Sequence, residues 1–313
     1  MFKGNETAVT EFVLLGFPGI KGFRPVFFLL ILTTYVVTLT INLIIIVLVS
    51  TTGRLNFPMY FFLKHLSLTE MAFLTTVVPN MLNVIWWEGA SIPTTGCITQ
   101  TYLYLALGST ECYLLTAMAY DRYLAICNPL LYATIMDHKR QHLLSISSWV
   151  SGFVITSITL IFLCHLKFCG PNIIDHFFCD LVPFVELACN HKNELQSEIL
   201  VLTFPIAVIP FVLILTSYIC VFINILGIST TTGRSKAFST CSSHLSVVSL
   251  YYGTVLAIYL VPAKGHSLSK NKVMVLMYIV VTPLFNPIIY CLRNQEMRVT
   301  LRNLVSIGTD SRF

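Results

Sequence analysis

An acid and a base stand side by side, Asp121 and Arg122, inside a stretch of sequence that is otherwise apolar or weakly polar. In the hydrocarbon of a bilayer, each such charge costs roughly 2.5–3.5 kcal/mol by insertion scales. The two charges can neutralise each other as a pair at a helix end, or they can form a pair that opens when the protein changes shape. Which of these applies depends on where the helices place them.

Two further carboxylates, Glu70 and Glu111, lie in the middle of apolar stretches. With a helical rise of about 1.5 Å per residue, both fall at a similar depth, about 16 Å into the membrane. Carboxylates at one level repel each other unless one is protonated or a cation bridges them. Two interpretations stay open: a sodium or proton site built from Glu70, Glu111, Asn42 and Asn286, or protonated carboxyl groups hydrogen-bonded to Asn42, Ser67 and Asn286.

The elements that position these residues are long apolar helices. Of 313 residues 56% are hydrophobic and only 11% are charged, which nearly excludes a soluble enzyme. The apolar runs are long enough to cross a bilayer as helices and too uniform for barrel strands. We therefore predict an all-α membrane protein, a single domain over 1–313 with seven transmembrane helices. Their expected ranges are 26–50, 57–86, 97–127, 141–166, 197–227, 235–262 and 272–292, followed by a short amphipathic helix over 294–304.

The orientation is predicted from charge, glycosylation and cysteines. More Lys and Arg fall on the inner side if the N-terminus is extracellular and the C-terminus cytoplasmic. Asn5 begins an N-glycosylation acceptor, which requires the same orientation. Four cysteines then lie in the oxidising compartment, where disulfides persist: Cys97, Cys169, Cys179 and Cys189. A metal site is the less favoured interpretation of part of this region: His165, Cys169, His176 and Cys179.

Five segments carry a family resemblance, in order and on the expected helices. They are PMYFFL at 58–63, MAYDRYLAICNPLLY at 118–132, Ser217-Tyr218, KAFSTCSSHL at 236–245 and PLFNPIIYCLRN at 283–294. With them the chain resembles a rhodopsin-like (class A) G-protein-coupled receptor, and within that class an olfactory (odorant) receptor. The resemblance covers nearly the whole chain and implies a receptor that is not an enzyme.

The resemblance assigns roles to several residues. It implies that Asp121 holds Arg122 at rest and that Arg122 meets the G protein when the helices separate. The expected set for switching and G-protein coupling is Asp121, Arg122, Tyr123, Tyr218, Lys236, His244, Asn286, Pro287 and Tyr290. It implies a sodium ion near Glu70, where such receptors usually carry Asp. It also implies two disulfides, Cys97–Cys179 and Cys169–Cys189.

By the same resemblance, a small volatile ligand binds in the outer half of the bundle. Positions counted from the motifs, and a stripe on the sixth helix, predict an apolar cavity with a few hydroxyl groups. Its expected lining is Tyr104, Leu105, Gly108, Ser109, Cys112, Ile199, Leu202, Thr203, Ile206, Tyr252, Val255, Leu256, Tyr259, Leu276 and Ile279. Each residue could instead be interhelical packing. An acid at Tyr104, as in amine receptors, and a lysine within 273–292, as in retinal proteins, are both lacking, which disfavours an amine receptor and a retinal protein.

These features lead to one expected function and one alternative. The first is an odorant receptor that activates a stimulatory, olfactory-type G protein and raises cyclic AMP. It would lie in the plasma membrane of olfactory cilia among membrane lipids. The alternative is a receptor of the same fold for a metabolite or lipid outside olfactory tissue. A basic cytoplasmic face accounts for the net charge of +5 without a nucleic-acid partner: Lys139, Arg140, Arg234, Lys236, Arg293, Arg298 and Arg302.

Overall fold

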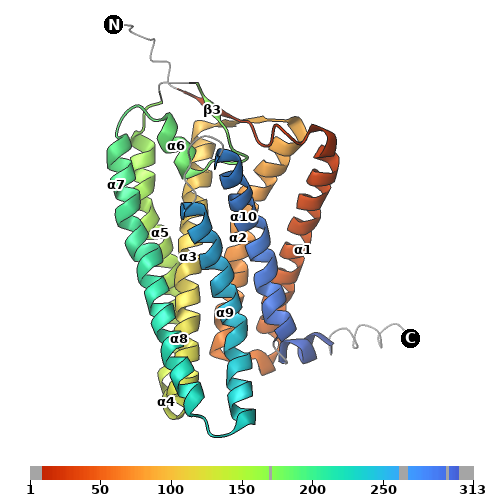
Figure 1. The fold of residues 1–313 in the computed structure, drawn as a ribbon, viewed down its shortest axis with the longest axis vertical. Coiled ribbons are helices and arrows are strands. Elements are labelled where there is room, and N and C mark those ends of the chain that lie inside the picture. The colour runs from red at the N-terminus through yellow and green to blue at the C-terminus, as the bar shows by residue number, and fades with distance from the viewer. Residues whose placement is uncertain (1–8, 169–170, 261–266, 294–295, 303–313) are drawn as a thin grey trace, which may run out of the picture.

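The computed structural model describes residues 9–168, 171–260, 267–293 and 296–302. Long helices run side by side and form a bundle, with the N-terminus at one end and the C-terminus at the other (Figure 1). We call the N-terminal end the outer end and the opposite end the inner end. Within the described residues the long helices are α1 (Arg24–Thr51), α2 (Pro58–Trp87), α3 (Thr94–Cys127), α5 (His138–His165), α7 (Lys192–Thr203) with its continuation α8 (Ile209–Gly227), α9 (Thr231–Leu260) and α10 (Ser267–Arg293).

Apolar composition explains how these helices sit in a bilayer. Among the described residues, five helical segments are long and apolar enough to cross a membrane on those grounds alone. The helix α3 falls outside this group and carries three charged residues, Glu111, Asp121 and Arg122. Packing resolves the apparent conflict: α3 contacts α2, α5, α8 and α9, so its charged residues face protein rather than lipid. The fold is the expected seven-transmembrane bundle.

Local chemistry sets several helix boundaries. Proline occupies the first turn of α1 and α2, where its missing N–H leaves no hydrogen bond unmade. The Asp137 side chain caps α5 by accepting a hydrogen bond from the Arg140 N–H at 2.8 Å. Pro205 lies in a π-helical turn, η3 (Phe204–Val208), that joins α7 to α8, so the expected fifth helix is interrupted there.

Shorter elements close the two ends. At the outer end β1 (Glu11–Leu14) pairs antiparallel with β2 (Ala90–Pro93) and parallel with β3 (Ile173–Ile174). The short helix α6 (Leu181–Leu187) lies beside this sheet, above α3 and α5 (Figure 1). The remaining elements are the inner α4 (Pro129–Ile135) and two short 3-10 turns, η1 (Lys21–Phe23) and η2 (Gly53–Leu55). Of the expected amphipathic helix over 294–304, the described part, 296–302, is helical.

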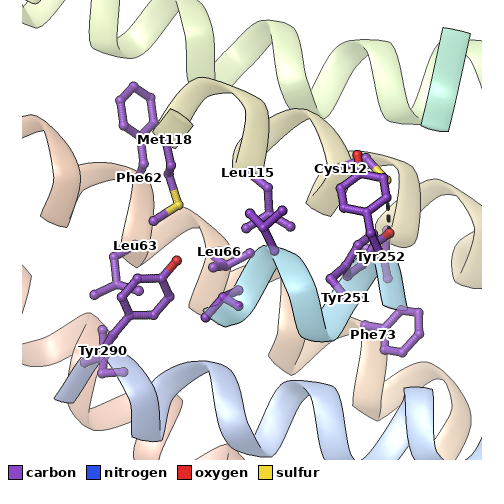
Figure 2. Packing of buried hydrophobic residues seen from close by; sticks show 14 of the residues in the cluster. Phe62, Leu63, Leu66, Phe73, Cys112, Leu115, Met118, Tyr251, Tyr252 and Tyr290 are labelled. Carbon is purple, nitrogen blue, oxygen red and sulfur yellow. Dashed lines mark hydrogen bonds between the residues drawn. The ribbon is translucent and has the colours of Figure 1, made fainter. Parts of the chain in front are cut away.

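The core combines large apolar side chains with one close helix approach. Figure 2 shows Phe62 and Leu66 of α2, Leu115 and Met118 of α3 and Tyr290 of α10 packed together. Beside them, a methyl group added at Gly152 of α5 would lie 2.3 Å from the Thr110 hydroxyl oxygen of α3. In a membrane, small residues at such contacts allow the helix–helix packing that stabilises the bundle.

Candidate functional site

The charged pair of α3 is buried at its inner end. Both guanidinium Nε and Nη2 of Arg122 contact the same Asp121 carboxylate oxygen, Oδ2. The other oxygen, Oδ1, accepts a hydrogen bond from the Tyr132 hydroxyl of α4 at 2.7 Å. Asp121 is fully buried and Arg122 is 9% exposed, so the pair is not the solvated helix-end pair that was the alternative. Tyr132 belongs to the segment 118–132 that carries the family resemblance, but its hydrogen bond to Asp121 was not predicted.

A second polar contact joins α8 to α9 near this pair. The Tyr218 hydroxyl lies 2.5 Å from His244 Nδ1, and both residues are buried. Tyr290 of α10 is buried as well, and its hydroxyl has no hydrogen-bond partner among the described residues. Tyr123 is partly buried, and its ring stacks on the ring of Tyr120, about one turn earlier in α3. Pro287 is buried inside α10, whereas Lys236 lies in the first turns of α9 and its side chain lies outside what the structure describes.

The mid-membrane carboxylates share one amide. Asn286 Nδ2 donates to Glu70 Oε1 at 2.6 Å and to Glu111 Oε1 at 3.3 Å. The buried oxygens Asn42 Oδ1 and Asn286 Oδ1 have no hydrogen-bond partner among the described residues. Two carboxylates and two free amide oxygens are ligands suited to a hard cation such as sodium. The same geometry accommodates a proton held between the carboxyl groups, so the donor set fits either interpretation.

A cavity of about 360 Å³ opens beside α3 in the outer half of the bundle. This volume suits a small organic molecule. The structure brings ten of the fifteen expected lining residues to it: Tyr104, Leu105, Gly108, Ser109, Cys112, Ile199, Leu202, Thr203, Ile206 and Val255. It adds residues that were not expected, from five elements: Thr156, Thr159, Asp180, Leu181, Val182, Ala207, Tyr251, Ile258, Val275 and Tyr278.

On α9 and α10 the structure places some of the expected residues away from the cavity. Of the expected neighbours Val255 and Leu256, Val255 lines the cavity, whereas Leu256 is 50% exposed on the lipid-facing side of α9. One residue rotates a helix position by about 100°, which turns a side chain from the cavity to lipid. On α10, Val275 and Tyr278 line the cavity in place of Leu276 and Ile279, and Ile279 is fully buried in the core between the helices.

Two further α9 positions need separate comment. Tyr252 is buried, but its ring packs on Phe211 and Tyr251 and does not line the cavity, so this expectation was also wrong. It is Tyr251 that reaches α3, because its hydroxyl donates to the Gly108 carbonyl at 2.9 Å and contacts Cys112 Sγ at 3.1 Å (Figure 2). The side chain of Tyr259 lies outside what the structure describes. Gly108 lines the cavity, and a methyl group added there would lie 3.3 Å from the Tyr278 hydroxyl oxygen.

The outer loops form a lid that is tied to α3. The expected disulfide Cys97–Cys179 is present. It is reinforced by two hydrogen bonds: the Thr101 hydroxyl donates to the Cys179 carbonyl at 2.9 Å, and the Cys179 N–H donates to Gln100 Oε1 at 3.0 Å. The expected partner of Cys189, Cys169, and the expected glycosylation site Asn5 lie outside the described residues.

The metal interpretation of the lid is not supported by the residues that the structure describes. Cys179 is consumed in the disulfide, and His165 is exposed with its Nδ1 bonded to the Ile161 carbonyl. His176 is buried between Phe177 and Phe178. Burial and the nearby Lys272 lower its pKa to about 3, so it is neutral. No cluster of three or more candidate metal ligands occurs within 9–168, 171–260, 267–293 and 296–302.

Asp180 is the charged residue of the cavity that the sequence analysis missed. It follows Cys179 directly, so the disulfide that ties the lid to α3 also fixes this carboxyl above α3. Burial raises the pKa of Asp180 to about 6. Local periodicity gave no signal for it, because Asp180 reaches the cavity through the disulfide between distant segments.

Comparisons with known proteins agree with this architecture. A family model described as "Olfactory receptor" matches residues 31–306. The chain is 43% identical to human "Olfactory receptor 6B1" over 300 residues, which cover 96% of each chain. It is 44% identical to human "Olfactory receptor 11A1" over 97% of this chain and 96% of that one. Mouse "Olfactory receptor 5P81" is 45% identical over 96% of this chain and 95% of its own.

Proposed function

The chain belongs to the olfactory receptor family, and from this premise we propose how it detects a ligand and what signal it sends. It is a G-protein-coupled odorant receptor, a multi-pass protein of the plasma membrane, and not an enzyme. We infer that a small, mostly hydrophobic volatile binds in the cavity beside α3 and that the receptor then activates a stimulatory, olfactory-type G protein, which raises cyclic AMP.

The cavity is the single observation that carries this proposal. It lies between the lid, the helices α3, α5, α7, α9 and α10 and the turn η3, and its walls are apolar apart from hydroxyl groups and Asp180. Burying an apolar ligand gains about 25 cal/mol per Å² of apolar surface removed from water. A volatile of modest size therefore binds by shape and burial, and its polar group determines its orientation in the cavity.

The output step follows from the inner contacts. A ligand beside Tyr251 and Val255 touches α9, the helix that His244 links to Tyr218 of α8. Movement of α9 would break this link and let Arg122 leave Asp121 for the cavity that opens at the inner end. Exposed basic residues at that end would attract an acidic partner and anionic lipid: Lys139, Arg140, Arg234, Arg298 and Arg302. Two more expected members, Lys236 and Arg293, have side chains outside the described part.

The test measures cyclic AMP in cells that express the chain, across a panel of small volatiles. The control is Arg122→Ala with surface expression confirmed by an extracellular tag. A dose-dependent rise that disappears in the control supports the proposal. Silence of the correctly placed receptor towards every volatile would contradict it and would favour the alternative, a metabolite or lipid ligand outside olfactory tissue.

For the polar centre at Glu70 and Glu111 we propose that sodium or a proton stabilises the inactive state. The support is the pair of carboxylates with two unpaired amide oxygens around them. A cation held there would keep α2, α3 and α10 together and oppose their separation. Basal cyclic AMP should rise when external sodium is replaced by N-methylglucamine. If sodium has no effect in wild type and Glu111→Gln changes nothing, the sodium interpretation fails.

A further inference from the structure

The outer wall of the cavity carries an unpaired acid. Asp180 lines the cavity together with Leu181 and Val182 of the lid. Its Oδ1 accepts a hydrogen bond from the Leu181 N–H at 2.8 Å, which caps α6. Among the residues that the structure describes, no ion pair involves Asp180. One carboxylate oxygen is thus used by the fold, and the negative charge has no partner.

A second carboxylate stands directly behind the wall. Thr159 of α5 lines the cavity, and its hydroxyl donates to Glu198 Oε1 of α7 at 2.7 Å. The other oxygen, Glu198 Oε2, is buried and has no hydrogen-bond partner in the described part of the chain. Asp180 and Glu198 therefore give this side of the cavity a negative potential, which low-dielectric surroundings strengthen.

Among the residues that the structure describes, no positive charge compensates this potential at the wall, since the described lining includes neither lysine nor arginine. The lysine closest in sequence to a lining residue is Lys272, which stands one helical turn before Val275 in α10. Its ammonium group lies 2.5 Å from Asp175 Oδ1 and 3.1 Å from the Gly16 carbonyl, so the lid engages its charge. His176 of the same lid is neutral and cannot compensate either.

We propose that Asp180 is the polar anchor of the cavity and that the receptor prefers small volatile amines, bound as alkylammonium ions with the chain in the apolar part. This inference rests on the proposed odorant function and narrows its ligand class. The sequence disfavoured an amine ligand because α3 carries no acid at Tyr104; in this proposal the acid is supplied by the lid instead.

The chemistry favours an ammonium ion over other polar groups. The Asp180 carboxyl stays largely ionised at neutral pH with a pKa of about 6, and a bound cation would stabilise the ionised form further. Charge-assisted hydrogen bonds are roughly twice as strong as neutral ones. An alcohol can still donate one neutral hydrogen bond to the same oxygen. A carboxylate ligand would instead face Asp180 and the charge of Glu198, which is a repulsive arrangement.

The experiment compares hexylamine, hexan-1-ol and hexanoic acid, which share a six-carbon chain and differ at the polar end. Cyclic AMP dose–response curves are measured for wild type, Asp180→Asn and Glu186→Gln, with surface expression quantified. Asparagine still caps α6, so Asp180→Asn removes the charge and keeps the hydrogen bond to Leu181. Glu186→Gln removes an exposed charge from the same short helix and is the matched control.

The proposal expects hexylamine to be at least tenfold more potent than hexan-1-ol in wild type and hexanoic acid to be weakest. Asp180→Asn should reduce hexylamine potency at least tenfold and hexan-1-ol potency less than threefold. Glu186→Gln should change neither, and Asp180→Glu should retain the amine preference. If neutral volatiles activate the receptor while hexylamine is no better, or if Asp180→Asn affects all ligands alike, the amine inference is overturned and the odorant function stands. Silence to all volatiles would overturn both.

Discussion

The part of α3 beside the cavity and its inner half satisfy their polar groups in different ways. Beside the cavity two hydroxyl groups bond to their own helix: Ser109 donates to the Leu105 carbonyl and Thr110 to the Ala106 carbonyl. In the inner half and at mid-membrane, polar groups bond across helices, as Glu111 does with Asn286 and Asp121 with Tyr132. Side chains at the cavity can therefore change without breaking the bundle, whereas inner ones cannot. We therefore expect substitutions to be tolerated at the ligand site and not at the Asp121–Arg122 pair.

The largest effect is expected where this contrast is strongest, at Asp121. Asp121→Ala leaves the Arg122 guanidinium buried without its partner and removes the acceptor of Tyr132. Breaking one side of a buried ion pair costs about 3–5 kcal/mol. We expect severe loss of surface expression and of thermal stability in detergent. Asp137→Ala is the control, because this exposed acid only caps α5, a contribution of about 1 kcal/mol. Equal losses of surface expression and thermal stability in both variants would show that the buried pair matters no more than an exposed helix cap.

The next largest effect concerns the contact between α3 and α5. A side chain at Gly152 would collide with Thr110 Oγ1 and lie 2.9 Å from the Ala106 carbonyl oxygen. Gly152→Ala should therefore destabilise the receptor by about 1–3 kcal/mol, as overpacked cores do. Gly253→Ala in α9 is the matched control, because in the described part of the chain nothing beyond its sequence neighbours and its own helix backbone lies within 4 Å of the added methyl group. The midpoint of thermal unfolding measures both, and a loss only at Gly253 would show that the helix contact is wrongly placed.

A smaller effect is expected at the link between α8 and α9. Tyr218→Phe removes the hydroxyl beside His244 Nδ1 and leaves a buried polar group unpaired, which costs about 1–3 kcal/mol. Because this contact holds α9 in the resting arrangement, basal cyclic AMP should rise while stability falls. Tyr35→Phe, which loses only a weaker 3.3 Å contact with Thr75, should change neither measurement appreciably. Unchanged basal signalling in Tyr218→Phe would show that the contact with His244 does not hold the receptor in its resting state.

The same contrast explains what the sequence could predict. Long apolar runs placed the helices, and the family resemblance named residues of the inner end, although the hydrogen bond between Tyr132 and Asp121 was not predicted. The cavity wall was less predictable: Leu256 and Val255 are both apolar, and only packing decides which one faces the ligand. The strands β1 to β3 and the helix α6 depend on contacts between distant segments, so local periodicity carried no signal for them. The same is true of Asp180, which the disulfide brings to the cavity.

The smallest expected effect lies at the cavity wall itself. Ser109 lines the cavity, but its hydroxyl already donates to the Leu105 carbonyl at 2.8 Å, so it has little to offer a ligand. Ser109→Ala should leave stability unchanged within about 0.5 kcal/mol, as substitutions away from special features do. Ligand potency in the cyclic AMP assay should shift less than threefold. Leu256→Ala, on the lipid-facing side of α9, should shift it not at all. A tenfold change at Ser109 would mean that this hydroxyl turns from its own helix to the ligand, and the outer half of α3 would then resemble the inner half.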